Sequence, residues 1–213
     1  MKIIDLSHTI KPDMPMFPGE IPPVMQKTLT HEKEGVQVTK ITMNTHTGTH
    51  LDCPLHFLKE GTDTENTDPD QFYGKGFVID CTAFKNHETI PADHLKTFDP
   101  EIALAHFVLI RTDWSKHWGS DEYFNHFPVL SNEAAEYLVS KKVKGIGLDV
   151  ISIDAIDSSD YPNHYTTLGN NVLIIENLTN LHLLEGRAFH FAAFPLKFRE
   201  GDGSPVRAVA IVD

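Results

Sequence analysis

The stretch AHFVLIRT, residues 105–112, decides the fold class, because a short apolar run rich in Val, Ile and Phe is typical of a buried strand. Similar short apolar runs recur along the chain. We expect strands at residues 2–8, 35–44, 76–80, 105–112, 143–152, 171–178, 187–198 and 206–213. Since helical patterns are fewer than these runs, the sequence predicts an α/β or α+β domain with more strand than helix.

Three segments between the runs carry helix signals. The clearest is residues 131–142, where Ser131 can cap the first turn and two lysines complement the dipole at the other end. Shorter helices are expected at residues 91–98 and 162–168. The five prolines of residues 11–23 instead predict an extended arm or loop.

Length and composition limit the classes of protein that this chain can be. With 213 residues and 40% hydrophobic content it can bury one sizeable core, so we expect a single domain over residues 1–213. The 18 basic and 30 acidic residues give a charge of -12, which would repel nucleic acid. Without a signal-like segment or a long apolar run, we expect a cytoplasmic protein with no membrane contact.

The stretch HTGTHLDCPLHF, residues 46–57, concentrates potential metal ligands. Four of them share one parity and would project from one face of an extended chain: His46, His50, Asp52 and His56. Imidazole and carboxylate are ligands for ions such as zinc and manganese, and Asp52 has two oxygens with which to bridge two ions. A lone histidine is usually an ordinary surface residue, but four ligands in phase indicate a metal site. Cys53 has the opposite parity and should point away from it.

Further ligands must come from elsewhere in the chain, because one strand leaves a side of the ion open. Glu176 lies inside the apolar run VLIIENL, where an unpaired carboxylate is costly to bury unless a metal neutralises it. His164 lies in a segment rich in turn-forming residues. Taken alone, Glu176 could equally be a charge at the exposed end of the strand, whereas His164 would be interpreted as a surface loop residue.

The pattern H-x-x-x-H-x-D-x-P-x-H resembles the signature of the cyclase family, which includes bacterial kynurenine formamidases (arylformamidases) and isatin hydrolases. The likeness extends over nearly the whole chain, through DLSHTIKPDMPMFPGE, FVLIRTDW, GIGLDVISID and FPLKFREGDGSPVRAVAI. It implies a single compact α/β domain with a central mixed β structure and few helices, of the swivelling β/β/α type. It also implies assembly into homodimers or homotetramers.

The resemblance implies a role for each candidate residue. The metal ligands would be His46, His50, Asp52, His164 and Glu176. They would hold two zinc ions per chain, with manganese as the alternative. His56 would be the proton donor and acceptor. Phe17 stands where the formamidases have a tryptophan that meets the aromatic substrate; phenylalanine can stack on such a substrate but lacks the indole N–H donor.

These parts predict a metal-dependent hydrolase that cleaves an amide-type C–N bond. Its substrate would be a small aromatic molecule, either an aryl formamide such as N-formylkynurenine or a cyclic amide such as isatin. Metal-activated water would attack the carbonyl while His56 moves the proton.

Two alternatives stay open at this point. The residues His50, Asp52 and His164 also match the two-histidine, one-carboxylate triad of non-haem iron oxygenases, although that triad leaves the other candidate ligands unused. A non-catalytic metal-binding module is the second alternative. Weaker candidates for supporting roles are His8, Asp149 and Arg207.

Overall fold

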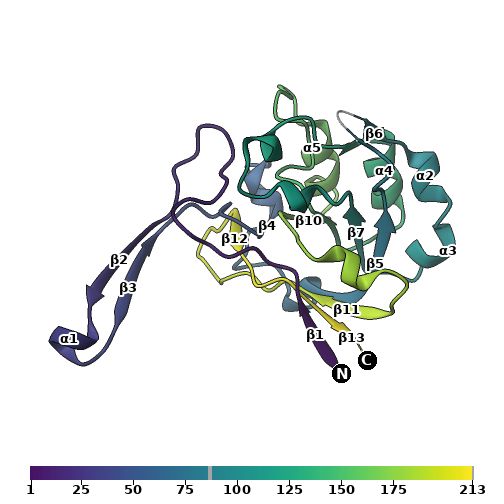
Figure 1. Ribbon diagram of the computed structural model, residues 1–213. Helices are drawn as coiled ribbons and strands as arrows, with labels where there is room; N and C mark the ends of the chain where they lie inside the picture. Colours follow the sequence, from purple (N-terminus) through teal and green to yellow (C-terminus); the bar gives the residue numbers. More distant parts are fainter. Residues whose placement is uncertain (86–87, 213) are drawn as a thin grey trace.

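A nine-stranded mixed sheet forms the centre of the protein in a computed structural model, which describes residues 1–85 and 88–212 (Figure 1). The strand order is β1 (Lys2–Asp5), β13 (Val209–Val212), β11 (Phe189–Ala192), β5 (Tyr73–Asp80), β7 (Phe107–Arg111), β9 (Gly145–Leu148), β10 (Leu173–Glu176), β4 (His50–Asp52) and β12 (Gly203–Pro205). The four strands β5, β7, β9 and β10 run parallel, and the pairs outside them are antiparallel.

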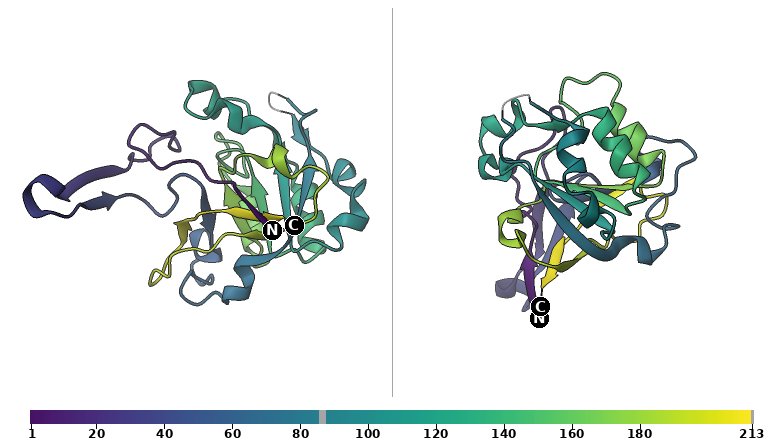
Figure 2. Two further views of the ribbon diagram at one scale, coloured as in Figure 1. Left: turned by 60° about the horizontal axis from the view of Figure 1, so that its bottom comes forward. Right: turned by 90° about the vertical axis from the view of Figure 1, so that its right-hand side faces the viewer.

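The central strands are buried on both faces, which explains their unbroken apolar sequence. On β7, Val108 and Ile110 face one core cluster, while Phe107 and Leu109 face the other. The first cluster is covered by the helices α2 (Ala92–Lys96), α4 (Asn132–Ser140) and α5 (Pro162–Leu168), which lie on one side of the sheet (Figure 2). The fold class expected from the sequence, a mixed α/β structure with few helices, is confirmed.

The remaining elements are short. They are the helices α1 (His31–Glu34) and α3 (Asp99–Ile102), the paired strands β6 (Thr89–Ile90) and β8 (Val129–Leu130), and the 3₁₀ turns η1 (Pro54–His56), η2 (Pro69–Phe72), η3 (Trp114–His117), η4 (Asp121–Phe124) and η5 (Leu181–Leu184). No helix in the described ranges is long and apolar enough to cross a membrane.

A two-stranded hairpin projects from the body of the molecule. Its strands β2 (Val24–Leu29) and β3 (Val38–Thr42) pair antiparallel and extend away from the sheet (Figures 1 and 2). Every residue of both strands is exposed. The sequence predicts β3 within residues 35–44 but misses β2, because a strand with neither face buried has no hydrophobic alternation to detect.

Most predicted elements are present but shorter than expected. The strand predicted at 187–198 ends at Ala192, three residues before Pro195, which cannot donate to a ladder. The strand predicted at 206–213 covers Val209–Val212, and residue 213 lies outside the described residues. Ser131 caps α4 as expected, since its Oγ accepts from the Ala134 N–H at 3.1 Å.

Candidate metal centre

Strand pairing brings the first three candidate ligands together. In the antiparallel register of β4 and β10, His50 lies opposite Glu176, and Asp52 lies two residues further along β4. The His50 Nε2 is 3.2 Å from Asp52 Oδ1 and 3.5 Å from Glu176 Oε2. Leu51 and Cys53 lie in the core cluster on the opposite face, as their parity predicts. The three polar groups therefore meet at the carboxyl end of β10, the usual place for a site in such sheets.

The extended path expected from His46 to His56 is wrong for most of its length. Gly48, with φ at +69°, turns the chain before β4, and the 3₁₀ turn at Pro54–His56 follows it. These two turns, rather than strand parity, bring His46 and His56 to the site. Their rings stack with centroids 3.8 Å apart, and His46 Nδ1 lies 2.6 Å from Asp52 Oδ1.

His164 lies in the first turn of α5 and is buried, although the sequence suggested a surface loop. Asp154 fixes this turn, because its carboxylate accepts from the backbone N–H groups of Asn163 and His164, both at 3.0 Å. The His164 Nε2 then lies 3.7 Å from Glu176 Oε1 and 4.0 Å from Asp52 Oδ2.

Hydrogen bonds behind three imidazoles direct their lone pairs inward. His50 Nδ1 donates to the Gly48 carbonyl at 2.8 Å, and a carbonyl can only accept, so Nε2 presents its lone pair. His164 Nδ1 likewise donates to Asp154 at 2.7 Å. His46 Nε2 faces Asp202 at 3.1 Å, which leaves Nδ1 toward Asp52. Metal-binding histidines are oriented in this way.

Burial and charge also fit a divalent cation. Asp52 is 1% exposed, and its Oδ2 is buried without a hydrogen-bond partner among the described residues. Burial raises the pKa of Glu176 to about 8, and the nearby Asp52 carboxylate adds to the effect. Burial alone would lower the pKa of His46, but Asp52 and Asp202 outweigh it and raise that pKa to about 10. Glu176 and His46 thus tend to stay protonated, and a bound cation would supply the positive charge that these protons provide.

Two groups of three residues each have donor atoms that all lie within 4.8 Å of one another, and Asp52 belongs to both groups. They are His46, Asp52 and His56, and His50, Asp52 and Glu176. Donors of this type, packed this closely, fit two ions that share one carboxylate. The first group contains His56, so its geometry permits a ligand role as well as the proton transfer expected from the sequence.

Phe17 lies beside this cluster in the same chain. It lines a cavity of about 40 Å³ together with Met16, His46, His50 and Glu176, among others. The structure thus brings together all seven residues singled out by the sequence for metal, proton or substrate contact.

Sequence reasoning missed Asp154 and Asp202. Asp154 precedes His164 by ten residues, and Asp202 lies between two glycines in a turn, so neither has a local pattern that indicates contact with the motif. The weaker candidates lie outside the cluster. The His8 ring stacks on Trp118, Asp149 accepts from Thr112, and Arg207 pairs with Asp5.

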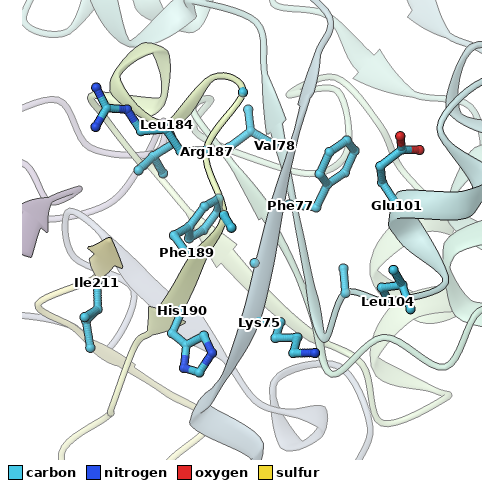
Figure 3. Close-up of a pocket in the computed structure, with 14 residues that line it drawn as sticks. Lys75, Phe77, Val78, Glu101, Leu104, Leu184, Arg187, Phe189, His190 and Ile211 are labelled. Carbon is cyan, nitrogen blue, oxygen red and sulfur yellow. The ribbon is translucent and has the colours of Figure 1, made fainter. Parts of the chain in front are cut away.

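A larger groove of about 630 Å³ lies away from the cluster, along β5, β11 and α3 (Figure 3). Phe77, Phe189 and Leu104 line it, with Lys75 and His190 at one end. Among the described residues, neither donor group includes a residue of this groove. The size of a cavity therefore does not locate the reaction. The donor cluster, formed by the two donor groups and the adjacent His164, is the better candidate site.

Comparison with known proteins decides the family. Residues 4–155 match the family model described as "Putative cyclase". The chain belongs to this cyclase family. A kynurenine formamidase of Bacillus cereus is 34% identical over 207 residues, which cover 97% of this chain and 95% of the relative. The kynurenine formamidase of Bacillus anthracis is 34% identical over 209 residues, or 98% of this chain and 96% of the relative.

Solved structures of cyclase-family proteins share the fold. Isatin hydrolase A from Ralstonia solanacearum has a TM-score of 0.90 at 28% identity, and the match covers 100% of this chain and 92% of that hydrolase. An isatin hydrolase bound to the product analogue thioisatinate has a TM-score of 0.89 at 27% identity and covers 99% and 92%. The resemblance seen in the sequence is confirmed, and the chain is a metal-dependent hydrolase of amide-type bonds. The iron oxygenase and the non-catalytic module are not favoured.

Proposed function

We propose that this protein hydrolyses a small aromatic amide with two divalent ions bound at the donor cluster. The observation that carries the proposal is the convergence of three imidazole lone pairs on two buried carboxylates, with Asp52 shared between two groups of donors. The substrate would be an aryl formamide such as N-formylkynurenine, or a cyclic aryl amide such as isatin. The first is suggested by the names of the curated relatives and the second by those of the structural neighbours.

The five residues that would hold the ions are His46, His50, Asp52, His164 and Glu176. We propose zinc, with manganese as the alternative that the same donors accept. A bound divalent ion polarises a carbonyl oxygen and lowers the pKa of water from 15.7 to about 7. The protein's contribution is to keep the donors dry and fixed, which the hydrogen bonds behind each imidazole support.

His56 would carry the proton. Its side chain is 29% exposed, whereas that of Asp52 is 1% exposed, so His56 stands at the rim, where a substrate can reach it. In the proposed reaction water adds to the carbonyl carbon and the C–N bond breaks. His56 takes a proton from the attacking water and returns it to the departing nitrogen, so that the ring ends as it began.

Phe17 would contact the aromatic part of the substrate. Its ring lines the small cavity next to His50 and Glu176, so the aryl group of a substrate bound at the donor residues would lie near it. Phenylalanine offers a face for stacking and no hydrogen bond, so we expect selection for the ring itself more than for polar groups on it.

Metal titration and turnover together test the proposed function. Metal-depleted protein would be titrated with Zn²⁺ and Mn²⁺ and assayed on N-formylkynurenine, formanilide and isatin. We expect close to two equivalents per chain and hydrolysis of at least one compound. His50→Ala should weaken metal binding and lower kcat/KM by about 10³-fold, or ~4 kcal/mol, since it removes a ligand. The control is His182→Ala, an exposed histidine of η5.

Wild-type protein that binds no metal after reconstitution, or His50→Ala protein with full metal content and activity, would contradict the proposal. Hydrolysis of isatin without deformylation, or the reverse, would leave the reaction class intact and name the substrate.

We also propose that two copies of the chain assemble through the β2–β3 hairpin, as a homodimer or as part of a homotetramer. A lone two-stranded hairpin is at best marginally stable in water, and this one exposes Val24, Met25, Val38 and Ile41. Residues 24–42 carry three lysines and two glutamates, whereas the whole chain has a charge of -12. A mildly basic, apolar element on an acidic protein is complementary to the body of a second copy.

A further inference from the structure

Asp202 lies in a turn that is fastened to the histidine motif by its backbone. The Cys53 N–H donates to the Asp202 carbonyl at 2.9 Å, and β12 begins at the next residue, Gly203, which pairs with Asp52. A Cβ on Gly203 would lie 2.7 Å from His46 Cε1 and 2.7 Å from the Leu51 carbonyl oxygen. Only glycine allows the turn to pack this closely against the His46 ring, so the Asp202 backbone has a fixed position beside it.

The Asp202 carboxylate faces two imidazoles at once. Thr45 Oγ1 donates to Oδ1 at 2.9 Å and sets the rotation of the carboxylate. The other oxygen, Oδ2, lies 3.1 Å from His46 Nε2 and 3.8 Å from His56 Nδ1. Because the two rings stack with centroids 3.8 Å apart, this one oxygen can interact with a nitrogen of each ring.

We propose that Asp202 is a positioning residue that orients His46 toward the metal and His56 toward the substrate. Its carboxylate accepts a hydrogen bond from His46 Nε2–H, which leaves Nδ1 facing Asp52. By attracting Nδ1 of His56 it keeps Nε2 as the nitrogen that meets the reacting groups. The inference rests on the proposed function, because it takes His46 as a metal ligand and His56 as the proton carrier.

Asp202 differs from the groups behind the other imidazoles. The Gly48 carbonyl accepts a hydrogen bond from one imidazole, that of His50. The Asp154 carboxylate also accepts from one imidazole, that of His164. Asp202 faces one residue assigned to metal binding and one assigned to proton transfer. Its substitution should therefore weaken metal binding and also slow the metal-saturated enzyme, two effects that loss of a purely structural contact would not combine.

The test compares Asp202→Asn with Glu200→Gln, the control at an exposed residue two positions earlier in the same turn. Zinc affinity of the metal-free protein would be measured by competition with a chelator, and kcat and KM at saturating zinc. We expect Asp202→Asn to bind zinc about 10- to 100-fold more weakly, since it alters the group behind a ligand, and kcat to fall while KM stays unchanged. Glu200→Gln should match the wild type.

Thr45→Val provides an independent arm in case Asp202→Asn fails to fold. It keeps the carboxylate but removes the hydrogen bond that fixes it, and we expect zinc affinity and kcat each to fall about threefold. If Asp202→Asn has the zinc affinity and kcat of the wild type, the role of Asp202 is overturned and the proposed function stands. If Asp202→Asn does not fold, the same result in Thr45→Val has the same consequence. A wild type that binds no zinc would overturn both.

Discussion

The β2–β3 hairpin and the histidine motif that follows it in the chain lie in opposite environments. Both hairpin strands are exposed at every position, whereas all three residues of β4 are buried. The hairpin presents apolar side chains that no other part of the described chain covers, and β4 presents ionisable groups that meet mainly one another. Under the proposed function a second chain would cover the hairpin, and cations would bind the motif.

The largest expected effect separates proton transfer from metal binding within the motif. His56→Ala should keep both metal equivalents and lower kcat by about 10²- to 10⁴-fold, because general acid–base catalysis is lost. Elemental analysis and steady-state kinetics on the same preparation measure the two quantities. If the variant loses a metal equivalent, His56 is a ligand, as its place in the first donor group permits.

A smaller expected effect is on the pH dependence of stability, and it concerns Asp149, a buried carboxylate outside the donor cluster. Its Oδ1 accepts from the Thr112 N–H at 2.9 Å and the Thr112 hydroxyl at 2.6 Å, yet burial raises its pKa to about 6. The folded protein therefore binds this proton more tightly than the unfolded chain, so stability is greatest below the unfolded pKa and falls as pH rises through about 6.

Asp149→Asn should remove this pH dependence. Between pH 4 and pH 7 the wild type should lose up to about 3 kcal/mol of unfolding free energy relative to the variant, from a pKa shift of roughly two units. Urea unfolding of the metal-free proteins at several pH values measures this difference in unfolding free energy. Parallel pH profiles for the two proteins would show that Asp149 is not the titrating group.

The smallest expected effect concerns assembly. Met25 and Ile41 are cross-strand neighbours on one face of the hairpin, and replacing both with threonine removes apolar surface without touching the core. We expect at least a tenfold rise in the dissociation constant, or ~1.4 kcal/mol, with metal content unchanged. Light scattering after size-exclusion chromatography, over a range of dilutions, measures it.

Leu104→Thr is the matched control for the hairpin variant, since Leu104 is an exposed apolar residue beside the groove of Figure 3. A monomeric wild type would contradict assembly. Dissociation by Leu104→Thr alone would move the interface from the hairpin to the groove.

Local sequence signals predicted what local structure determines. The run FVLI in β7 is continuous because parallel strands bury both faces, and His50 and Asp52 share a face because strand parity is a property of neighbours. The arrival of His46 and His56 depends on turns at Gly48 and Pro54, which parity does not describe. Asp202 is brought to the motif by the pairing of β12 with β4, a contact between segments about 150 residues apart that leaves no pattern in either one.

The candidate ligands come from three places that lie far apart in the chain: the segment around β4, the end of β10 and the first turn of α5. The two cations proposed for these ligands, with Asp52 in both donor groups, would tie the segments together much as a covalent cross-link would. Folding and metal supply then become linked quantities, since an ion at 100 times its dissociation constant adds about 2.7 kcal/mol to the stability of the chain that holds it. A cell short of the metal would hold less of the folded enzyme as well as less of the active one.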